Sequence, residues 1–424
     1  MTTTVTSLEN EIVQLSRRAK AASRRLAELS TDAKNALLED LAHRLSQPDA
    51  RATLLAANAR DLEAGARKGL TGALLDRLKL DSKRMDSMIR GLREVARLPD
   101  PVGVDRQSWT RPNGLQVAKR TIPLGVIGII YEARPNVTID AFSLCFKAGN
   151  ATVLKGGSEA IHSNRALVDL VARTLAPAGL SDACRLLDTT DRNAIAIMVR
   201  QEEFIDLIIP RGGEGLIRFV AATSRIPVIK HYKGVCNIYV DEEADLEKAL
   251  TIAENAKISR PAVCNAVENL LIHEKAAARF LPRFARRMDQ AGVELRGDDR
   301  TCEILPEATP ATDEDYHEEF LDLILAVRVV SNLDEAVAHI ETYGSDHTES
   351  IVTENQATGE AFLNRVNSSV VLVNASTRFS DGGELGLGAE IGISTTRLHA
   401  YGPMGLESLV TEKFVIVGDG QIRV

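Results

Sequence analysis

The sequence lacks most features that mark secreted, membrane or nucleic-acid-binding proteins. Its five cysteines are odd in number and widely spaced, with no C-x-x-C pair, so we expect neither a disulfide framework nor a metal site. No apolar run reaches the roughly 18 residues of a membrane span, and the polar, acidic first ten residues do not resemble a secretory signal. The net charge of −8 argues against nucleic-acid binding. These absences predict a cytoplasmic protein with no membrane or nucleic-acid partner.

What is present is the composition of a globular protein. Hydrophobic residues make up 44% of the chain and charged residues 26%, a balance typical of folded soluble domains. A length of 424 residues is too great for one ordinary core. We therefore expect two or three domains.

The first hundred residues have apolar positions three or four apart, which predicts amphipathic helices. Asp100 to Asn113 is rich in proline, glycine and polar residues, and we interpret it as a linker. After Pro123, apolar runs of strand length alternate with helical segments. This pattern is typical of βαβ units with a parallel sheet buried on both faces. The runs are Gly125–Tyr131, Ala151–Gly157, Arg185–Thr189 and Asp206–Gly213.

A second alternating series starts near Asn237 and predicts a second α/β domain. The tail Phe414–Val424 resembles a strand, a Gly-Asp-Gly turn and a short return strand. A strand after both domains needs a sheet to join. It could pair with Leu115–Thr121 or with a neighbouring subunit.

Cys264 is the candidate nucleophile. It lies in SRPAVCNA, from Ser259 to Ala266, between a predicted helix and a buried strand, and such loops often carry catalytic groups. On local sequence alone, a lone cysteine is more often a small buried hydrophobic residue.

Two glycine-rich loops follow buried strands. KGGSE begins at Lys155 and RGGEG at Arg211. Backbone amides at the start of a helix, together with a lysine, can hold an anion. Each loop alone could be a tight turn, but two in one parallel sheet favour a dinucleotide. A third loop, NASTRFSDGGE from Asn374, could clamp a carboxylate or could be an ordinary solvated loop.

Together these segments resemble the γ-glutamyl phosphate reductases (glutamate-5-semialdehyde dehydrogenases), a branch of the aldehyde dehydrogenase superfamily. The resemblance spans nearly the whole chain. It is carried by PLGVIGIIYEARPNVT (Pro123–Thr138), AGNATVLKGGSEA (Ala148–Ala160), DLIIPRGG (Asp206–Gly213), RPAVCNAVENLLIH (Arg260–His273), EEFLDLILAV (Glu318–Val327), VNASTRFSDGGELGLGAEIGIST (Val373–Thr395) and GPMGLESL (Gly402–Leu409).

The resemblance implies the aldehyde dehydrogenase-like α/β fold, with two parallel-sheet α/β domains and a small β element for oligomerisation. The expected NADP(H)-binding domain covers 1–105 and 124–235, and the catalytic domain 236–397 carries Cys264. The oligomerisation element covers 106–123 and 398–424, and a homo-oligomer is expected.

The resemblance also implies Cys264 as the catalytic thiolate, and Asn136 is the candidate side-chain donor of an oxyanion hole. The expected binding residues divide by ligand. The cofactor, NADPH or NADP+, is assigned to Lys155, Gly156, Gly157, Ser158, Gly212, Gly213 and Glu319. The substrate, L-glutamyl 5-phosphate, is assigned to Arg260, Asn374, Ser376, Thr377 and Arg378.

The implied reaction reduces L-glutamyl 5-phosphate to L-glutamate 5-semialdehyde through a Cys264 thioester, the second step of proline biosynthesis from glutamate. Oxidising aldehyde dehydrogenases carry a glutamate base in a segment like ELGGK. Here the matching stretch is HYKGVC, from His231 to Cys236, with no glutamate. Without that base, water is not activated against the thioester.

Two alternatives stay open: the chain could oxidise another aldehyde with NAD(P), or it could be a non-catalytic protein with the same fold. A third alternative is the reductase half of a bifunctional enzyme, but the sequence has no kinase-length N-terminal segment, so we expect a separate polypeptide. Since the acyl phosphate hydrolyses and cyclises readily, a transient contact with glutamate 5-kinase is chemically sensible.

Overall fold

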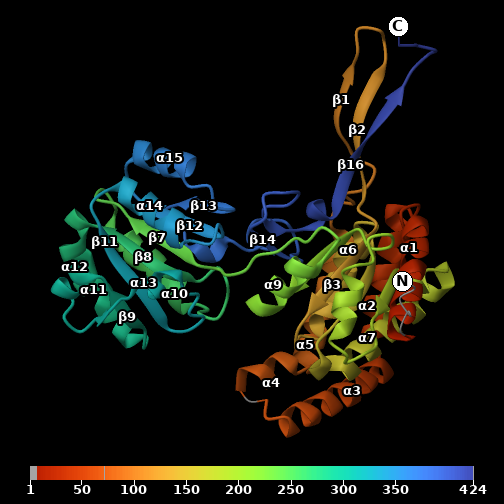
Figure 1. Ribbon diagram of the computed structural model, residues 1–424, viewed down its shortest axis with the longest axis horizontal. Coiled ribbons are helices and arrows are strands. Elements are labelled where there is room, and N and C mark those ends of the chain that lie inside the picture. Colours follow the sequence, from red (N-terminus) through yellow and green to blue (C-terminus); the bar gives the residue numbers. More distant parts are fainter. Residues whose placement is uncertain (1–6, 71, 424) are drawn as a thin grey trace, which may run out of the picture. The chain divides into compact units, whose positions relative to one another are not determined.

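The structure is a computed structural model that describes residues 7–70 and 72–423 (Figure 1). The chain forms two compact units. Unit 1 comprises the described residues up to 230 together with 387–392 and those from 404 onward, and unit 2 comprises 231–386 and 393–403. Among the described residues, no helix combines the length and apolar character needed to cross a membrane.

Unit 1 begins with helices, as the apolar spacing predicts. They are α1 (Ser7–Leu26), α2 (Thr31–Ser46), α3 (Pro48–Arg67), α4 (Gly72–Leu78) and α5 (Ser82–Arg97). Helix α1 buries Ile12, Leu15, Ala19 and Ala22, the positions expected to face the core. Pro48 opens α3 at its first position, where the missing N–H of proline costs no helical hydrogen bond.

A four-stranded sheet forms the core of unit 1, with the order β5-β4-β3-β6 and every pairing parallel. The parallel sheet expected after Pro123 is therefore confirmed. Its strands are β3 (Val126–Tyr131), β4 (Ala151–Lys155), β5 (Cys184–Leu186) and β6 (Leu207–Arg211). The helices that follow them are α6 (Asn136–Lys147), α7 (Ile161–Leu175), α8 (Asn193–Met198) and α9 (Glu214–Thr223), with short 3-10 turns η1 (Ser158–Ala160), η2 (Ala176–Ala178) and η3 (Ser181–Ala183).

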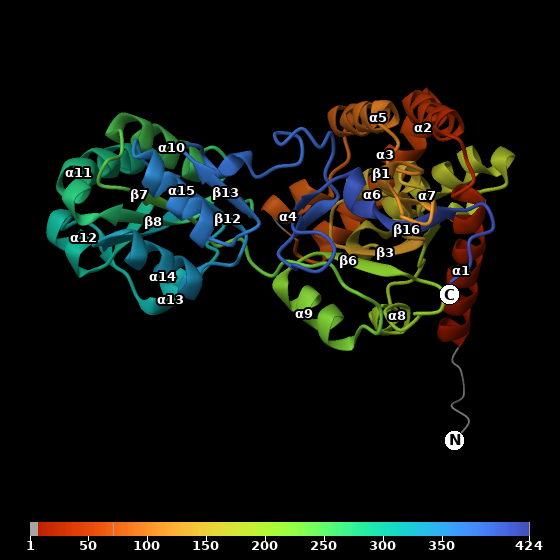
Figure 2. The same ribbon diagram turned by 90° about the horizontal axis from the view of Figure 1, so that it is seen from above.

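Helices cover both faces of this sheet (Figure 2). Helices α6 and α7 lie on one face, α1 and α8 lie on the other, and α2, α3 and α5 form an outer layer on α6 and α7. Strands covered on both sides must be apolar throughout, and β3 and β4 are buried at every position.

Unit 2 is built on a seven-stranded sheet with the order β10-β9-β11-β8-β7-β12-β13, again parallel in every pairing. The strands are β7 (Cys236–Val240), β8 (Val267–His273), β9 (Glu294–Gly297), β10 (Thr309–Pro310), β11 (Ile324–Val330), β12 (Thr348–Val352) and β13 (Val370–Val373). The helices are α10 (Leu246–Ile258), α11 (Glu274–Gln290), α12 (Asp299–Ile304), α13 (Asp313–His317), α14 (Leu333–Tyr343) and α15 (Gln356–Arg365), with η4 (Thr377–Phe379). Separate apolar clusters pack on the two faces of this sheet.

The expected linker from Asp100 to Asn113 is wrong in part, because it contains the strand β1 (Asp105–Thr110). All six residues of β1 are exposed, so the strand leaves no hydrophobic signal in the sequence. It pairs antiparallel with β2 (Gln116–Pro123), which pairs on its other side with β16 (Val410–Val417). These three strands form an arm that extends away from the parallel sheet of unit 1 (Figure 1).

The tail thus takes one of its two expected partners, the strand that includes residues 116–121 of its own chain. The expected return strand is wrong, because residues 421–423 have no strand structure. Before the arm, a two-stranded sheet of β14 (Gly392–Ser394) and β15 (Gly402–Met404) lies where the chain passes from one unit to the other, and η5 (Leu406–Leu409) follows. The three-part division by role, with its expected boundaries, stays a prediction.

Candidate active site

Cys264 lies on the loop between α10 and β8 and is half-buried. None of the five cysteines forms a disulfide. Cys145, Cys184 and Cys236 are buried, and burial raises the pKa of each of these three thiols. Burial also raises the pKa of Cys302. The other four thiols are therefore poorly suited to act as thiolates, which leaves Cys264 as the candidate nucleophile.

The backbone of Cys264 rests on the segment that leads into β7. A Cβ atom built on Gly234 would lie 2.1 Å from the carbonyl oxygen of Cys264 and 2.6 Å from its Cα, so only glycine fits there. The Cys236 thiol donates a hydrogen bond to the same carbonyl oxygen at 3.1 Å. Since burial raises the pKa of Cys236 well above its ordinary value, that thiol keeps its proton and stays a donor. Gly234 and Cys236 were not expected as site residues.

A buried histidine lies behind Cys236. The Nδ1 atom of His347 is 3.6 Å from the Cys236 sulfur and 2.8 Å from the Thr348 hydroxyl. Burial lowers the pKa of His347 to about 3, so the ring is neutral. The His231 ring packs edge-on against it at 6.0 Å. The support behind Cys236 therefore includes a buried, neutral imidazole.

The loop after β13 holds the residue that follows the nucleophile. The Thr377 hydroxyl donates to the backbone carbonyl of Asn265 at 2.7 Å, and the Asn265 amide donates to the backbone carbonyl of Ser380 at 2.9 Å. Both Thr377 and Asn265 are buried. Thr377 was expected to contact the substrate, but its hydroxyl donates a hydrogen bond to the loop that carries Cys264.

Two further candidates of this loop also bond within the protein. The side-chain amide of Asn374 donates to the carbonyl of Thr353 at 2.8 Å and accepts from its N–H at 3.0 Å. The Ser376 hydroxyl accepts from the N–H of Arg378 at 3.3 Å. The structure therefore gives Asn374 and Ser376 partners in the chain itself.

Arg378 brings a cation to the nucleophile loop. Its Nε donates to the Ser259 hydroxyl at 3.2 Å. Burial lowers the pKa of Arg378, and so does the neighbouring charge of Arg260, while Asp381 and Cys264 act in the opposite direction. Arg378 is therefore within electrostatic range of both Arg260 and the Cys264 thiol. Two neighbouring guanidinium groups, one of them within electrostatic range of the Cys264 thiol, can receive an anionic substrate.

Glu319 lies close to the same region. It is half-buried, just before β11, and its charge acts on both Cys236 and Glu268. Within unit 2 the structure therefore gathers Cys264, Arg260, Arg378 and Glu319 around the amino ends of β7, β8 and β11.

In unit 1, Lys155 ends β4 and is 5% exposed. Its amine donates to the Gly156 carbonyl at 2.8 Å. Burial lowers its pKa, against the opposing charges of Glu159 and Asp191. A Cβ on Gly156 would lie 2.1 Å from the Asn164 amide nitrogen, so this turn requires glycine.

Two backbone amides at the start of α7 are already bonded within the chain. The backbone N–H groups of His162 and Ser163 both donate to the carboxylate of Asp61, at 3.1 and 2.8 Å. Likewise, the Glu159 carboxylate accepts the N–H of Ala133 at 2.8 Å. The anion site expected at this helix start is therefore filled by the chain's own carboxylate, and Lys155 is left as the cation of the loop.

The second glycine loop begins α9. The N–H of Gly213 donates to the Glu132 carboxylate at 3.0 Å, and a Cβ on Gly212 would lie 2.7 Å from the carboxyl carbon of Glu132. Open space lies beside Gly213 and Gly215, where an added Cβ meets nothing within 4 Å. Asn136 starts α6 and donates from Nδ2 to the Asp140 carboxylate at 2.9 Å, a bond that uses one of its two amide hydrogens.

These residues fit an anionic nucleotide. Lys155 is a buried amine with donors beyond the one used for Gly156. No ion pair of Lys155 occurs within the described part of the chain. The Asn164 Nδ2 atom is buried and also has no hydrogen-bond partner among the described residues. A buried cation with unused donors is suited to ribose hydroxyls or a phosphate.

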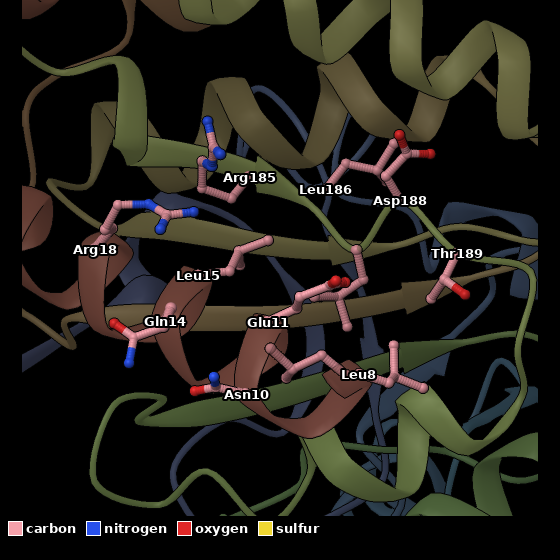
Figure 3. Close-up of a pocket in the computed structure, with 12 residues that line it drawn as sticks. Leu8, Asn10, Glu11, Gln14, Leu15, Arg18, Arg185, Leu186, Asp188 and Thr189 are labelled. Carbon is pink, nitrogen blue, oxygen red and sulfur yellow. The ribbon is translucent and has the colours of Figure 1, made fainter. Parts of the chain in front are cut away.

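Unit 1 has a separate hollow between the first turns of α1 and the end of β5 (Figure 3). Its wall includes the guanidinium groups of Arg18 and Arg185, which both approach the carboxylate of Asp182 at 3.4 Å. Because Asp182 lies beside both guanidinium groups, and Glu11 and Asp188 also line the hollow, we assign no ligand to it.

Comparison with known proteins identifies the family of this chain. The model of the aldehyde dehydrogenase family matches residues 2–318. A γ-glutamyl phosphate reductase of Desulfatibacillum aliphaticivorans is 55% identical over 98% of this chain and 100% of its own length. That of Geotalea daltonii is 57% identical over the same shares.

A solved structure extends the similarity to three dimensions. The crystal structure of γ-glutamyl phosphate reductase from Thermotoga maritima matches with a TM-score of 0.96 and 44% identity, over 98% of this chain and 100% of that one. The chain therefore belongs to the aldehyde dehydrogenase family, in its γ-glutamyl phosphate reductase branch.

Proposed function

We propose that this chain catalyses the NADPH-dependent reduction of L-glutamyl 5-phosphate to L-glutamate 5-semialdehyde, with release of phosphate, in proline biosynthesis. The observation that carries the proposal is the setting of Cys264. Its backbone is seated on Gly234 and Cys236, and Arg378 lies within electrostatic range of its thiol. A held backbone beside a cation suits a nucleophile.

The first step is acyl transfer to Cys264. The thiolate attacks the γ-carbonyl carbon, the bond from that carbon to the phosphate oxygen breaks, and phosphate leaves with the electron pair. Arg378 and Arg260 are the proposed cations for the thiolate and for the substrate's negative charge. The other three substrate candidates, Asn374, Ser376 and Thr377, are proposed to shape the site by holding the loops.

An oxyanion hole stabilises the tetrahedral oxygen of this step. We propose the backbone N–H of Cys264 as one donor, since Gly234 and Cys236 fix the backbone at that point. Asn136 is the proposed side-chain donor, through the amide hydrogen that its bond to Asp140 does not use.

Members of the aldehyde dehydrogenase family use a nicotinamide dinucleotide, and we propose NADPH for this chain. When bound, it supplies the hydride that reduces the thioester carbon. Lys155, with Gly156, Gly157 and Ser158, would hold the adenosine ribose and its 2′-phosphate, Gly212 and Gly213 the pyrophosphate, and Glu319 the nicotinamide ribose. Cys264 is then released as thiolate when the carbon–sulfur bond breaks and the semialdehyde departs.

The stretch that would carry the water-activating glutamate of an oxidising aldehyde dehydrogenase begins here at His231, and its residues favour reduction. At His231 the chain has an imidazole, whose Nδ1 lies 3.0 Å from the backbone carbonyl of Ile393. This contact orients the imidazole, and the stretch from His231 to Cys236 supplies no carboxylate of the kind that activates water in oxidising aldehyde dehydrogenases. Phosphate, not water, is therefore the proposed partner of the thioester in the reverse direction.

The test is an assay in that reverse direction. Purified protein should reduce NADP+ in the presence of glutamate semialdehyde only when inorganic phosphate is added, and more slowly with NAD+ or with other aldehydes. Oxidation to free glutamate without phosphate would instead identify an oxidising aldehyde dehydrogenase. Failure to bind NADPH would support a non-catalytic protein.

We also propose that the arm joins copies of this chain into a homo-oligomer. Phe414, Ile416 and Val417 are 63%, 60% and 62% exposed, although a strand this apolar is normally covered. Deleting Phe414–Val424 should give monomers in sedimentation, and replacing Phe414 and Ile416 with threonine should weaken assembly while keeping the strand. An oligomer of unchanged size after deletion would refute this role.

A cytoplasmic location and a transient contact with glutamate 5-kinase complete the proposal. Both follow from the chemistry of the substrate, since a labile acyl phosphate is best used where it is made.

A further inference from the structure

A buried ion pair joins the two ends of the Cys264 loop. Lys257 lies at the end of α10 and Glu268 at the start of β8. The Lys257 amine is 2.6 Å from Oε2 of Glu268, and both side chains are 0% exposed. Lys257 also donates to the backbone carbonyl of Val267 at 3.2 Å. The two ends of the loop that carries Cys264 are thus joined to each other, and we call this junction the root of the loop.

Glu268 bonds a third segment with its other oxygen. The backbone N–H of Leu321 donates to Oε1 of Glu268 at 3.3 Å. Leu321 has a φ of +54°, a left-handed conformation that is unfavourable for a non-glycine residue. Such a conformation persists only where the surroundings hold it.

Phe320 adds to the same junction. Its ring centroid is 6.0 Å from the Lys257 amine and 5.2 Å from the Arg296 guanidinium carbon, distances at which cation–π attraction acts. The segment 318–322, which includes Glu319, is therefore fastened to the root of the Cys264 loop by a hydrogen bond and by a ring contact.

Stability alone does not account for this pair. A buried ion pair is costly to desolvate, and replacing both partners with apolar residues of similar volume is often neutral or stabilising. An apolar residue at 268, however, has no acceptor for the Leu321 N–H. The Glu268 carboxylate therefore links two segments: one oxygen bonds Lys257 at the end of α10, and the other accepts the Leu321 N–H.

We propose that Glu268, held by Lys257, is a positioning residue that keeps Glu319 in register with Cys264. This inference rests on the proposed function, in which Cys264 carries the acyl group and Glu319 faces the nicotinamide ribose. The acceptor for Leu321, rather than the charge of the pair, sets the position of the segment. Loss of that acceptor slows hydride transfer and leaves the thiol of Cys264 as reactive as before.

Two double variants separate the acceptor from the charge. K257M/E268Q removes both charges but keeps a side-chain oxygen for the Leu321 N–H. K257M/E268M removes both charges and the acceptor, with a flexible side chain of similar volume. K248M/E354Q is the matched control, because it removes an exposed ion pair of the same unit. If K257M/E268M does not fold, K257M/E268L takes its place.

Three readouts are compared for each variant. The first is hydrogen exchange of peptides that cover 318–323, in protein without cofactor. The second is the rate of Cys264 alkylation by iodoacetamide. The third is the single-turnover formation of NADPH from NADP+ and glutamate semialdehyde, which reports the hydride step.

K257M/E268M should exchange the 318–323 amides at least tenfold faster and form NADPH at least tenfold more slowly, which is about 1.4 kcal/mol of barrier. Its alkylation rate should stay within threefold of wild type. K257M/E268Q and the control should stay within threefold in all three readouts.

The inference is overturned if the two double variants behave alike, whether both slow or neither does. A wild-type protein that forms no NADPH from the semialdehyde would instead refute the proposed function. Hydrogen exchange would then still decide whether Glu268 tethers Leu321.

Discussion

The candidate cofactor residues of unit 1 and the candidate nucleophile of unit 2 lie at opposite ends of their strands. In unit 1, Lys155 ends β4, Arg211 ends β6, and Asn136 follows β3. In unit 2, Cys264 precedes β8 and Glu319 precedes β11. Ligand sites of open α/β sheets ordinarily lie outside the carboxyl ends of the strands. The candidate cofactor residues of unit 1 follow this rule, as does the loop after β13 in unit 2, whereas Cys264 and Glu319 do not.

The difference extends to what supports each site. In unit 1, side-chain carboxylates accept hydrogen bonds from backbone N–H groups beside the glycine loops. The carboxylates are those of Asp61, Glu132 and Glu159. In unit 2, support comes from the first residues of the strands themselves, where Cys236 and Glu268 are buried beneath the nucleophile loop. A binding loop needs only fixed amides and one cation, whereas a nucleophile needs its own backbone held from below.

The sharpest test of unit 2 as the chemical unit is C264S. It should lower turnover by several orders of magnitude, because a hydroxyl is a much weaker nucleophile without an activating base. NADPH binding, measured by fluorescence titration, should be unchanged. If more than roughly a tenth of the wild-type rate remains, about 1.4 kcal/mol of barrier, covalent catalysis by Cys264 is wrong.

G234A tests the support beneath the nucleophile. The added methyl group would meet the Cys264 backbone at 2.1 Å and must displace it. A shift of about 1 Å at a reacting group can cost roughly a hundredfold in rate, and we expect a loss of that order in kcat.

G91A is the matched control for G234A, since an added Cβ on Gly91 meets nothing within 4 Å. Gly91 lies inside α5, so alanine there should be neutral or stabilise by about 0.5–1 kcal/mol. Equal activity of the two variants would remove Gly234 from the support.

K155A tests the cation of unit 1. NADPH binding should weaken by roughly 1.5–3 kcal/mol, the strength of a charge-assisted hydrogen bond, and NADH binding should weaken less. E159Q should act in the opposite direction by a few-fold, because it removes a carboxylate whose charge acts on Lys155. Equal losses of NADPH and NADH in K155A would exclude contact with the 2′-phosphate.

E349Q tests the buried acid of unit 2, with an effect on stability alone. Burial raises the pKa of Glu349 to about 8, although hydrogen bonds from Asn237 oppose the shift. A carboxyl with a raised pKa stabilises the folded state when protonated, and this contribution is lost as the pH rises through about 8. Between pH 6 and pH 8 the wild type should lose roughly 1–3 kcal/mol more stability than E349Q.

Thermal unfolding at both pH values provides the measurement for E349Q. Glutamine keeps an oxygen for the Asn237 donors and a polar group for Ser368, which donates to the other carboxyl oxygen at 3.1 Å. An identical pH dependence for the two proteins would show that Glu349 is already ionised in the folded state.

Much of this architecture was predictable because apolar runs that alternate with helical segments leave a strong signal. The strands β3, β4, β6, β8 and β11 were expected and confirmed. Strand β12 was missed, since TESIV begins with three polar residues, although all five positions are buried. Strand β1 was mistaken for a linker because it is exposed throughout.

A faint signal for the missed support residues does exist in the sequence. Glu268 is a charged residue inside the apolar run VENLLIH, and a carboxylate in a buried strand almost always has a partner. Gly234 precedes a strand by two residues, as many unimportant glycines do. Neither observation identifies the contacting residue, because only folding brings Lys257 to Glu268 and Cys264 to Gly234.

The sequence by itself determined that the chain would form two parallel-sheet units. It also identified Cys264 as the candidate thiol and the loops at Lys155 and Arg211 as the candidate cofactor loops. Those properties depend on local periodicity and on residues that are contiguous in the chain. Only the tertiary structure decided that Asp61 fills the start of α7, that Thr377 bonds Asn265 and that Glu268 joins Lys257 to Leu321. Most of these contacts join residues that are far apart in the sequence, so their geometry exists only after the sheets have assembled.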